Sequence, residues 1–284
     1  MARLVWHETG TKLYETGISH GVLYLRDADH AYTKGVAWQG LTSVDENPSG
    51  AEPTPLYADD IKYLVLMSVE EFGYTINAYS YPTEFEACDG TKDIAPGIKI
   101  GQQVRESFGF SYRTIIGSDT EGNDYGYKLH LVYGCTASPS DKTRSTVNDT
   151  PEAAEFSWEV TCIPVEILGF RPTANVVINS TEITPQNLAL IEAILYGSAS
   201  SPGNATGGTV VMYTDLAAIE GTLTSADAGR GWLVSSTNTV YVWNGTEFPA
   251  EGTGVAYVAP TVEQQARLPL PQELVTLVGA GGMG

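Results

Sequence analysis

Four stretches of the chain alternate between apolar and polar positions with a period of two: residues 71–81, 106–114, 125–134 and 154–162. Successive side chains of a β-strand point to opposite faces, so each stretch is predicted to be a strand with one buried face. The apolar positions are Phe72, Tyr74, Ile76 and Ala78; Phe108, Phe110 and Tyr112; Tyr127, Leu129, Leu131 and Tyr133; and Phe156, Trp158, Val160 and Cys162. The polar positions between them include Thr75, Asn77, Lys128, His130, Glu155 and Glu159.

A turn-rich sequence, GSDTEGND at 117–124, separates the second and third of these stretches. Gly, Asp and Asn in such a position are typical of a β-hairpin turn. Strands joined in this way predict a mainly β protein, an antiparallel β-sandwich or barrel.

Two segments carry helix signals instead. In the first, Pro82 stands where a first helical turn accepts proline and Gly90 where a C-cap belongs. In the second, Thr184 fits as the N-cap, Pro185 as the first helical residue and Gly197 as the stop. Its apolar face consists of Leu188, Ile191, Leu195 and Tyr196. We expect this second helix to flank one face of the sheet.

The composition changes after the second helix. Residues 197–208, GSASSPGNATGG, are small, polar and rich in Gly and Ser, which is typical of a flexible linker. A compact sequence with β character and turns at AGRG and WNGTEF follows, and the chain closes with a Pro-punctuated apolar segment. We therefore predict a core domain at 1–198, an inserted small β-rich domain at 199–265, and a C-terminal segment at 266–284 that packs back on the core.

A long acidic segment, residues 45–60, interrupts the first domain. It contains three prolines, one glycine and five carboxylates, and no His, Cys or Lys. Loops of this length are usually functional, so we expect a role for it, with a solvated surface loop as the alternative. The residues concerned are Asp45, Glu46, Asn47, Pro48, Glu52, Pro53, Pro55, Asp59 and Asp60.

The charge of the chain restricts its partners. The 284 residues carry a formal net charge of −19, with a pI near 4.4. Such a chain repels nucleic acid, so tight binding to DNA phosphates is excluded. The charge either serves solubility or keeps the surface from adhering to a polyanion that passes close by.

The cysteines and the N-terminal residues indicate the cellular compartment of the protein. Three widely spaced cysteines, Cys88, Cys135 and Cys162, form no disulfide framework, which favours a reducing compartment. The first residues contain no apolar signal region, and no apolar run has the length of a membrane span. We expect a protein that accumulates in the cytoplasm without contacting a membrane.

Candidate chemistry is sparse. The histidines His7, His20, His30 and His130 lack the spacing of a helical metal pair, and exposed or interface roles are the default. The C-terminal GAGGMG at 279–284 matches a dinucleotide-binding pattern in form only, because no helix follows it, and a flexible tail is expected. We expect no catalytic residue, no metal and no cofactor.

Aromatic residues of the inserted domain allow two interpretations. They form either a surface platform that stacks on sugars or the core that a module of this size needs, and the second is favoured. The residues are Trp232, Tyr241, Trp243 and Phe248.

Three sequence segments resemble those of a known family. They are GVAWQGLTSVDENPSGAEPTPLYADDIKYL; EEFGYTINAYSYPTEFEACDG with IAPGIKIGQQVRESFGFSYRT; and FSWEVTCIPVEI. Together they resemble the major tail proteins (tail tube proteins) of long-tailed, siphovirus-type bacteriophages. The similarity extends from residue 35 to about 197 and, after the insertion, from about 266 to 278. In the insertion, VYVWNGTEF is more weakly similar to small β units of other phage tail proteins.

The resemblance implies a structural virion protein made in the bacterial cytoplasm. It implies a β-sandwich with a flanking helix, which assembles into stacked homohexameric rings around a β-barrel lumen that conducts DNA without binding it tightly. The implied partners are further copies, a tape measure protein, a tail terminator and baseplate or initiator proteins. In such a tube, the acidic segment 45–60 is expected to contact the adjacent subunit or ring. Candidate lumen positions are Thr75, Asn77, Glu155 and Glu159.

Two alternatives stay open at this point. One is a phage or cell-surface carbohydrate-binding adhesin that acts through the inserted unit. The other is an acidic β-rich hydrolase, which the missing catalytic constellation disfavours. In a tube, we expect the insertion to lie on the outside, because a lumenal module would obstruct DNA.

Overall fold

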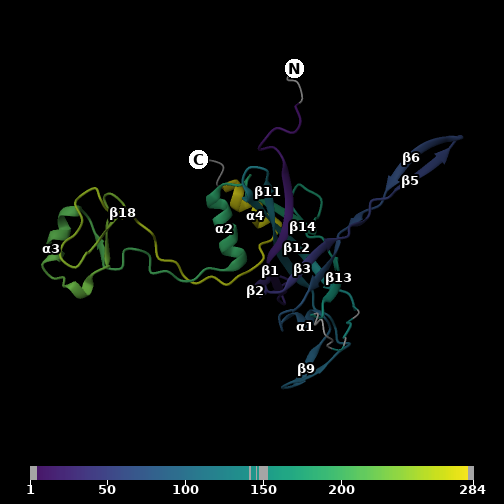
Figure 1. Ribbon diagram of the computed structural model, residues 1–284, viewed down its shortest axis with the longest axis horizontal. Helices are drawn as coiled ribbons and strands as arrows, with labels where there is room; N and C mark the ends of the chain where they lie inside the picture. Colours follow the sequence, from purple (N-terminus) through teal and green to yellow (C-terminus); the bar gives the residue numbers. More distant parts are fainter. Residues whose placement is uncertain (1–4, 141, 145, 147–152, 281–284) are drawn as a thin grey trace. The chain divides into compact units, whose positions relative to one another are not determined.

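The computed structural model describes residues 5–140, 142–144, 146 and 153–280 (Figure 1). The chain divides into two compact units. Unit 1 comprises Met1–Tyr196 and Gln265–Gly284, and unit 2 comprises Gly197–Gln264. The sequence placed the inserted domain at 199–265, within two residues of these bounds.

A large antiparallel sheet forms the body of unit 1, in agreement with the predicted fold class (Figure 1). Its strands follow the order β2 (Tyr32–Trp38), β1 (Leu13–Arg26), β11 (Phe108–Ser118), β12 (Gly122–Ala137), β13 (Phe156–Cys162), β8 (Gly73–Ala78) and β3 (Leu41–Glu46). An eighth strand, β14 (Asn175–Asn179), also pairs with β12. The 16-residue strand β12 is long enough to pair with β14 along 128–132 and with β13 along 135–137 on the same side.

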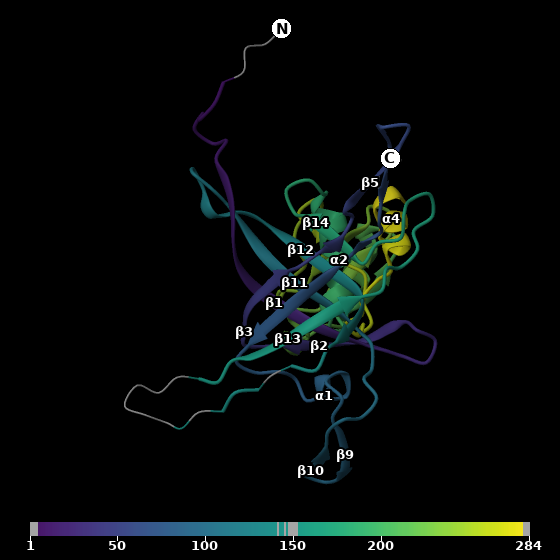
Figure 2. The same cartoon turned by 90° about the vertical axis from the view of Figure 1, so that its right-hand side faces the viewer.

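The sheet curls around its own aromatic core. Trp38 of β2 lies against Trp158 of β13, four strands away in the sheet order, with ring centroids 5.7 Å apart. Phe85 of the short helix α1 (Phe85–Cys88) fills the space beside both, at 4.6 and 5.1 Å. The predicted inward positions Tyr74 and Ile76 belong to the same cluster. Figure 2 shows this barrel-like arrangement of the strands.

The other face of the sheet is covered by two helices, α2 (Pro185–Tyr196) and α4 (Pro271–Ala280). Helix α2 begins at Pro185 as predicted, and Thr184 Oγ1 accepts a hydrogen bond from the Asn187 backbone at 3.4 Å. Its Ile191 and Leu195 are buried against the strands. The hydroxyl of Tyr24 in β1 donates to the Leu195 carbonyl at 2.9 Å, which ties the helix to the sheet.

The C-terminal segment returns to unit 1. Its backbone extends the sheet beyond β2, since Gly35 N–H donates to Ala266 O at 2.7 Å and Leu268 N–H to Tyr32 O at 3.1 Å. Helix α4 follows and was not predicted, although Pro271 as its first residue is a known start signal. The predicted tail at 279–284 is wrong for Gly279 and Ala280, which belong to α4, and residues 281–284 lie outside the described residues.

The acidic segment 45–60 is not the irregular loop that its sequence predicted. Asp45 and Glu46 end β3, and the rest belongs to a β-hairpin arm, residues 47–72. The arm is built from β4 (Ser49–Gly50), β5 (Pro53–Ala58), β6 (Ile61–Met67) and β7 (Glu70–Glu71). Pro53 and Pro55 lie two residues apart on β5, so both occupy the same kind of ladder position, and β5 is an edge strand, where proline is tolerated. The turn residues Asp59 and Asp60 have positive φ, as a tight hairpin requires. A second hairpin, β9 (Lys92–Ala95) with β10 (Ile98–Ile100), also extends from unit 1 (Figure 2).

Unit 2 has a small sheet of its own. Its strands follow the order β15 (Gly208–Val210), β16 (Gly231–Val234), β17 (Thr239–Val242) and β18 (Val255–Ala256), with β15 parallel to β16. The helix α3 (Leu216–Glu220) and 3₁₀ turns at Tyr213–Asp215 and Ser225–Asp227 complete the unit. The linker segments pair with each other through Ser198 with Gln264 and Ser201 with Thr261.

Candidate self-association surfaces

The hairpin arm extends away from the large sheet (Figure 1), and it carries a dense row of exposed apolar side chains. Every residue of β5 and β6 is exposed to solvent. Among the large apolar side chains of the arm, the exposed fraction ranges from 38% for Leu64 to 83% for Val69. The large apolar residues concerned are Leu56, Tyr57, Ile61, Tyr63, Leu64, Val65, Leu66, Met67 and Val69. Contiguous apolar surface of this kind marks a site of interaction with another macromolecule.

Both faces of the arm are apolar. Leu56 opposes Leu64 across the two strands, and Leu66 lies two residues along on the same face. Val65 and Met67 lie on the opposite face, where they oppose Pro55 and Pro53. A two-stranded ribbon that is apolar on both sides is marginally stable by itself. Covering these apolar faces would stabilise such a ribbon.

The residues of the acidic segment do not act as one group in the structure. Asp45 and Glu46 belong to β3, where Asp45 Oδ2 accepts a hydrogen bond from Asn77 Nδ2 at 2.9 Å. Asn47 also stays with the sheet, donating to Thr75 Oγ1 at 3.2 Å. The remainder belong to the arm: Pro48 and Glu52 lie in its proximal part, Pro53 and Pro55 in β5, and Asp59 and Asp60 at its tip.

Three of the four candidate lumen residues lie on one polar face. Thr75 and Asn77 on β8 neighbour Glu159 on β13, since Thr75 pairs with Glu159 and Asn77 with Ser157. The fourth, Glu155, precedes β13 and accepts a hydrogen bond from Thr42. The strands β3, β8 and β13 contain no Lys, Arg or His. Every side chain on this face is therefore either acidic or uncharged. The aromatic core lies beneath it, because Tyr74, Trp158 and Val160 point to the opposite side.

Strand edges are left without partners within the described part of the chain. The terminal strand β3 pairs only with β8, and β14 pairs only with β12. Beside β14, the side chains of Val177, Ile183 and Val275 line an apolar groove of about 550 Å³ between the strand and helices α2 and α4. An unpaired edge beside apolar surface is a template for pairing with another chain.

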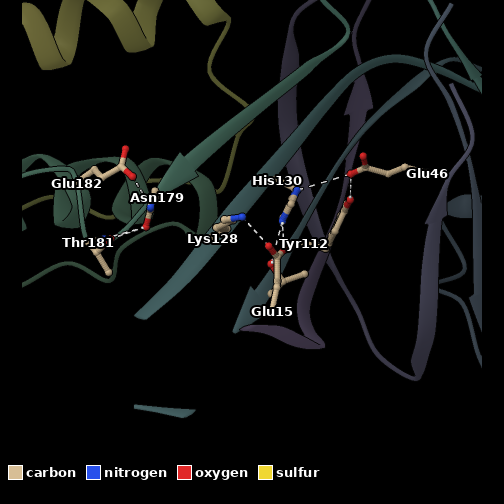
Figure 3. Close-up of polar contacts among 9 residues, drawn as sticks. Glu15, Glu46, Tyr112, Lys128, His130, Asn179, Thr181 and Glu182 are labelled. Atoms are coloured by element: carbon tan, nitrogen blue, oxygen red, sulfur yellow. Dashed lines mark hydrogen bonds and ion pairs between the residues drawn. The ribbon is translucent and has the colours of Figure 1, made fainter. Parts of the chain in front are cut away.

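A polar cluster at the base of the arm was missed by the sequence analysis (Figure 3). His130 was assigned to an exposed polar face, but it is buried, and its ring stacks on Tyr112. Its Nε2 lies 2.9 Å from Thr114 Oγ1 and 3.5 Å from Glu15, and its Nδ1 lies 3.8 Å from Glu46. The prediction was wrong because the curled sheet covers both faces of β12.

The electrostatics of this cluster follow from its burial. Burial lowers the pKa of His130, and the nearby carboxylates of Glu46 and Glu15 partly offset that effect. Tyr112 donates from its hydroxyl to Glu46 Oε1 at 2.8 Å, and Lys128 pairs with Glu15 at 2.5 Å. The cluster thus holds the end of β3, where the arm begins, against β1, β11 and β12.

The four aromatic residues of unit 2 are core residues, as the sequence favoured over a sugar-binding platform. Trp232, Tyr241 and Trp243 are each less than 5% exposed, and Phe248 is 9% exposed. They pack on one another and on Leu216 and Val234. The alternative of a surface platform for sugars is therefore wrong for these four residues.

Comparisons with protein families and with curated proteins give no match. A scan of protein families finds no model that fits this chain. A search of curated proteins also finds none that matches it. Within residues 5–140, 142–144, 146 and 153–280, no helix has the length and apolar character needed to cross a membrane. The same residues contain no group of His, Cys, Asp and Glu side chains arranged to hold a metal ion.

Proposed function

We propose that this protein is a structural subunit that associates with copies of itself into closed rings, and that stacked rings form the tail tube of a long-tailed bacteriophage. The observation that carries the proposal is the hairpin arm, a 26-residue extension at 47–72 whose two strands are exposed on both apolar faces. At about 25 cal/mol per Å² of apolar surface removed from water, covering such an arm is strongly favourable.

Closure into a ring is supported by the sheet edges. A lone copy leaves the outer edges of β3 and β14 unpaired among the described strands. Identical subunits related by rotation pair one edge with the other, and a closed ring leaves no edge free. The arm then has the neighbouring subunit or the adjacent ring as its natural partner.

The acidic face supports a DNA-conducting bore. We place the outward face of β3, β8 and β13, with Thr75, Asn77 and Glu159 and the preceding Glu155, on the inside of the ring. DNA phosphates find no cation on this face, and the carboxylates repel them over a screening length of about 8 Å at physiological salt. DNA slides past such a wall without adhering to it.

The remaining parts of the proposal follow the resemblance. The tube needs an initiator or baseplate complex, a tape measure protein and a tail terminator, and it needs no cofactor and no catalytic group. Unit 2 lies on the outside of the tube. The adhesin alternative is weaker, because the aromatic residues that would stack on sugars form the core of unit 2.

A matched pair of variants tests the arm. Val65 on β6 and Val211 in unit 2 are both exposed valines, 41% and 69% respectively. Val65→Asp places a charge on the arm, whereas Val211→Asp makes the same change elsewhere. We expect wild type and Val211→Asp to form rings or tubes in sedimentation velocity and negative-stain microscopy, and Val65→Asp to stay monomeric while it still unfolds in a cooperative thermal transition. Normal assembly of Val65→Asp would overturn the role of the arm.

A further inference from the structure

Two of the three free cysteines face each other across neighbouring strands. Cys135 on β12 pairs in register with Cys162 on β13, and their Sγ atoms are 3.9 Å apart. This contact could not be predicted from the sequence, because 27 positions separate the two residues. The third cysteine, Cys88, lies on α1.

The type of strand pairing suits a covalent bond between them. Ile163 N–H donates to Gly134 O at 3.0 Å, and Ser138 N–H donates to Glu159 O at 2.7 Å. Hydrogen-bonded and non-hydrogen-bonded pairs alternate along an antiparallel ladder, so Cys135 and Cys162 form a non-hydrogen-bonded pair. The Cα atoms of such pairs are about 4.5 Å apart, within the range that a disulfide spans.

The two thiols differ in access. Cys135 is fully buried, and its Sγ accepts a hydrogen bond from the Tyr74 hydroxyl at 3.2 Å. Burial raises the pKa of Cys135 well above its usual value, which makes it a poor first nucleophile. Cys162 is only partly buried and is the thiol that a small reagent reaches first.

We propose that Cys135 and Cys162 form an oxidative modification site that small disulfides of the glutathione type convert to an intramolecular disulfide. The thiolate of Cys162 attacks one sulfur of the reagent, which releases one reduced thiol and leaves a mixed disulfide on Cys162. The sulfur of Cys135 then loses its proton and displaces the second thiol. Two electrons and two protons pass from the protein to the reagent, which leaves as two thiols.

The position of the bond determines its effect. It joins β12 to β13 at the point where β12 passes from its β14 partner to its β13 partner. This junction connects the helix-covered part of the sheet to the strands that carry the acidic face. Closing a loop of 27 residues restricts the unfolded chain, so the oxidised protein is expected to have a Tm about 5–10 °C higher. The inference does not depend on the proposed tube.

The test uses the folded full-length protein and oxidised glutathione. We expect the intact mass to fall by two hydrogens, the free thiols to fall from three to one, and a reductant to reverse both changes. Trypsin cleaves after Lys142 and Arg144, so only a disulfide keeps the peptides of Cys135 and Cys162 together. Cys88→Ala is expected to form the same bond, and Cys162→Ala to form none.

Three results would overturn the inference. They are a glutathione that stays attached to Cys162 without closure, a disulfide that includes Cys88, and no change in thiol count after prolonged exposure. Peptide mapping of the wild-type protein distinguishes these outcomes even if a cysteine variant fails to fold.

Discussion

The imidazole ring of His130 lies parallel to the phenol ring of Tyr112, with ring centroids 4.5 Å apart and an interplanar angle of 1°. The stacked pair stands between Glu15 of β1 and Glu46 at the end of β3, where the chain leaves the sheet to form the arm. A buried titratable group at this point makes the stability of the sheet depend on pH.

The pH dependence has a definite sign. Because burial lowers the pKa of His130 in the folded state, the unfolded chain binds a proton below about pH 6.5 that the folded chain does not yet bind. Stability is therefore expected to fall as the pH drops from about 7 to 5, by at most about 1.4 kcal/mol per pH unit from this group. The lowered pKa of Glu15 acts only at lower pH, below the ordinary glutamate pKa of 4.5.

His130→Gln isolates this contribution, because glutamine does not take up a proton. Urea unfolding at pH 7, 6 and 5, in the Val65→Asp background that prevents assembly, is expected to give a flatter pH dependence for the variant. The neighbours of His130 stay in place in both proteins: the charged Glu15, Glu46 and Lys128, the hydrogen-bonded Thr114 and the stacked Tyr112. An identical slope in the two proteins would remove His130 as the cause.

Removing unit 2 is expected to leave assembly intact. Both cores of unit 1 are built from unit 1 residues, and Arg267 N–H donates to Ile194 O at 2.9 Å, so the ends of the insertion lie close together. A variant in which a short Gly/Ser linker replaces 197–264 should form tubes of normal diameter in negative-stain images, without the outer projection. Folded protein that no longer forms tubes would show that unit 2 takes part in assembly.

Reversing charge on the acidic face is expected to create DNA binding. Glu155→Lys with Glu159→Lys introduces cations on the face assigned to the bore, and Glu251→Lys with Glu263→Lys makes the same change in net charge on unit 2. All four residues are exposed. We expect assembled tubes of the first variant to retain short duplex DNA in co-sedimentation at low salt and to release it as salt rises. Equal retention by both variants would contradict the assignment of this face to the bore.

Sequence patterns predicted the strands and helices that can be recognised from residues close together in the sequence. Tyr74, Ile76 and Ala78 alternate with Thr75 and Asn77 because β8 has a core on one side and an uncovered polar face on the other. Helix α2 carries its own start and stop, Pro185 and Gly197. In these segments the pattern of the chain and the environment in the fold agree.

The missed features depend on contacts between distant parts of the chain. His130 looked exposed because its neighbour Lys128 is polar, and only the curl of the sheet brings Glu46 over it. The arm looked like a loop because Pro53 and Pro55 usually end strands, and only the pairing with β6 shows that they are tolerated there. The match of Cys135 with Cys162 likewise depends on the register of β12 with β13.

Cryo-electron microscopy of the concentrated wild-type protein tests the central claim most directly. The account predicts closed rings or stacked tubes in which the arm, residues 47–72, is buried against a neighbouring copy and Glu159 faces a central bore. Monomers at every concentration, or an assembly in which the arm stays in solvent and Lys or Arg side chains line the channel, would contradict it.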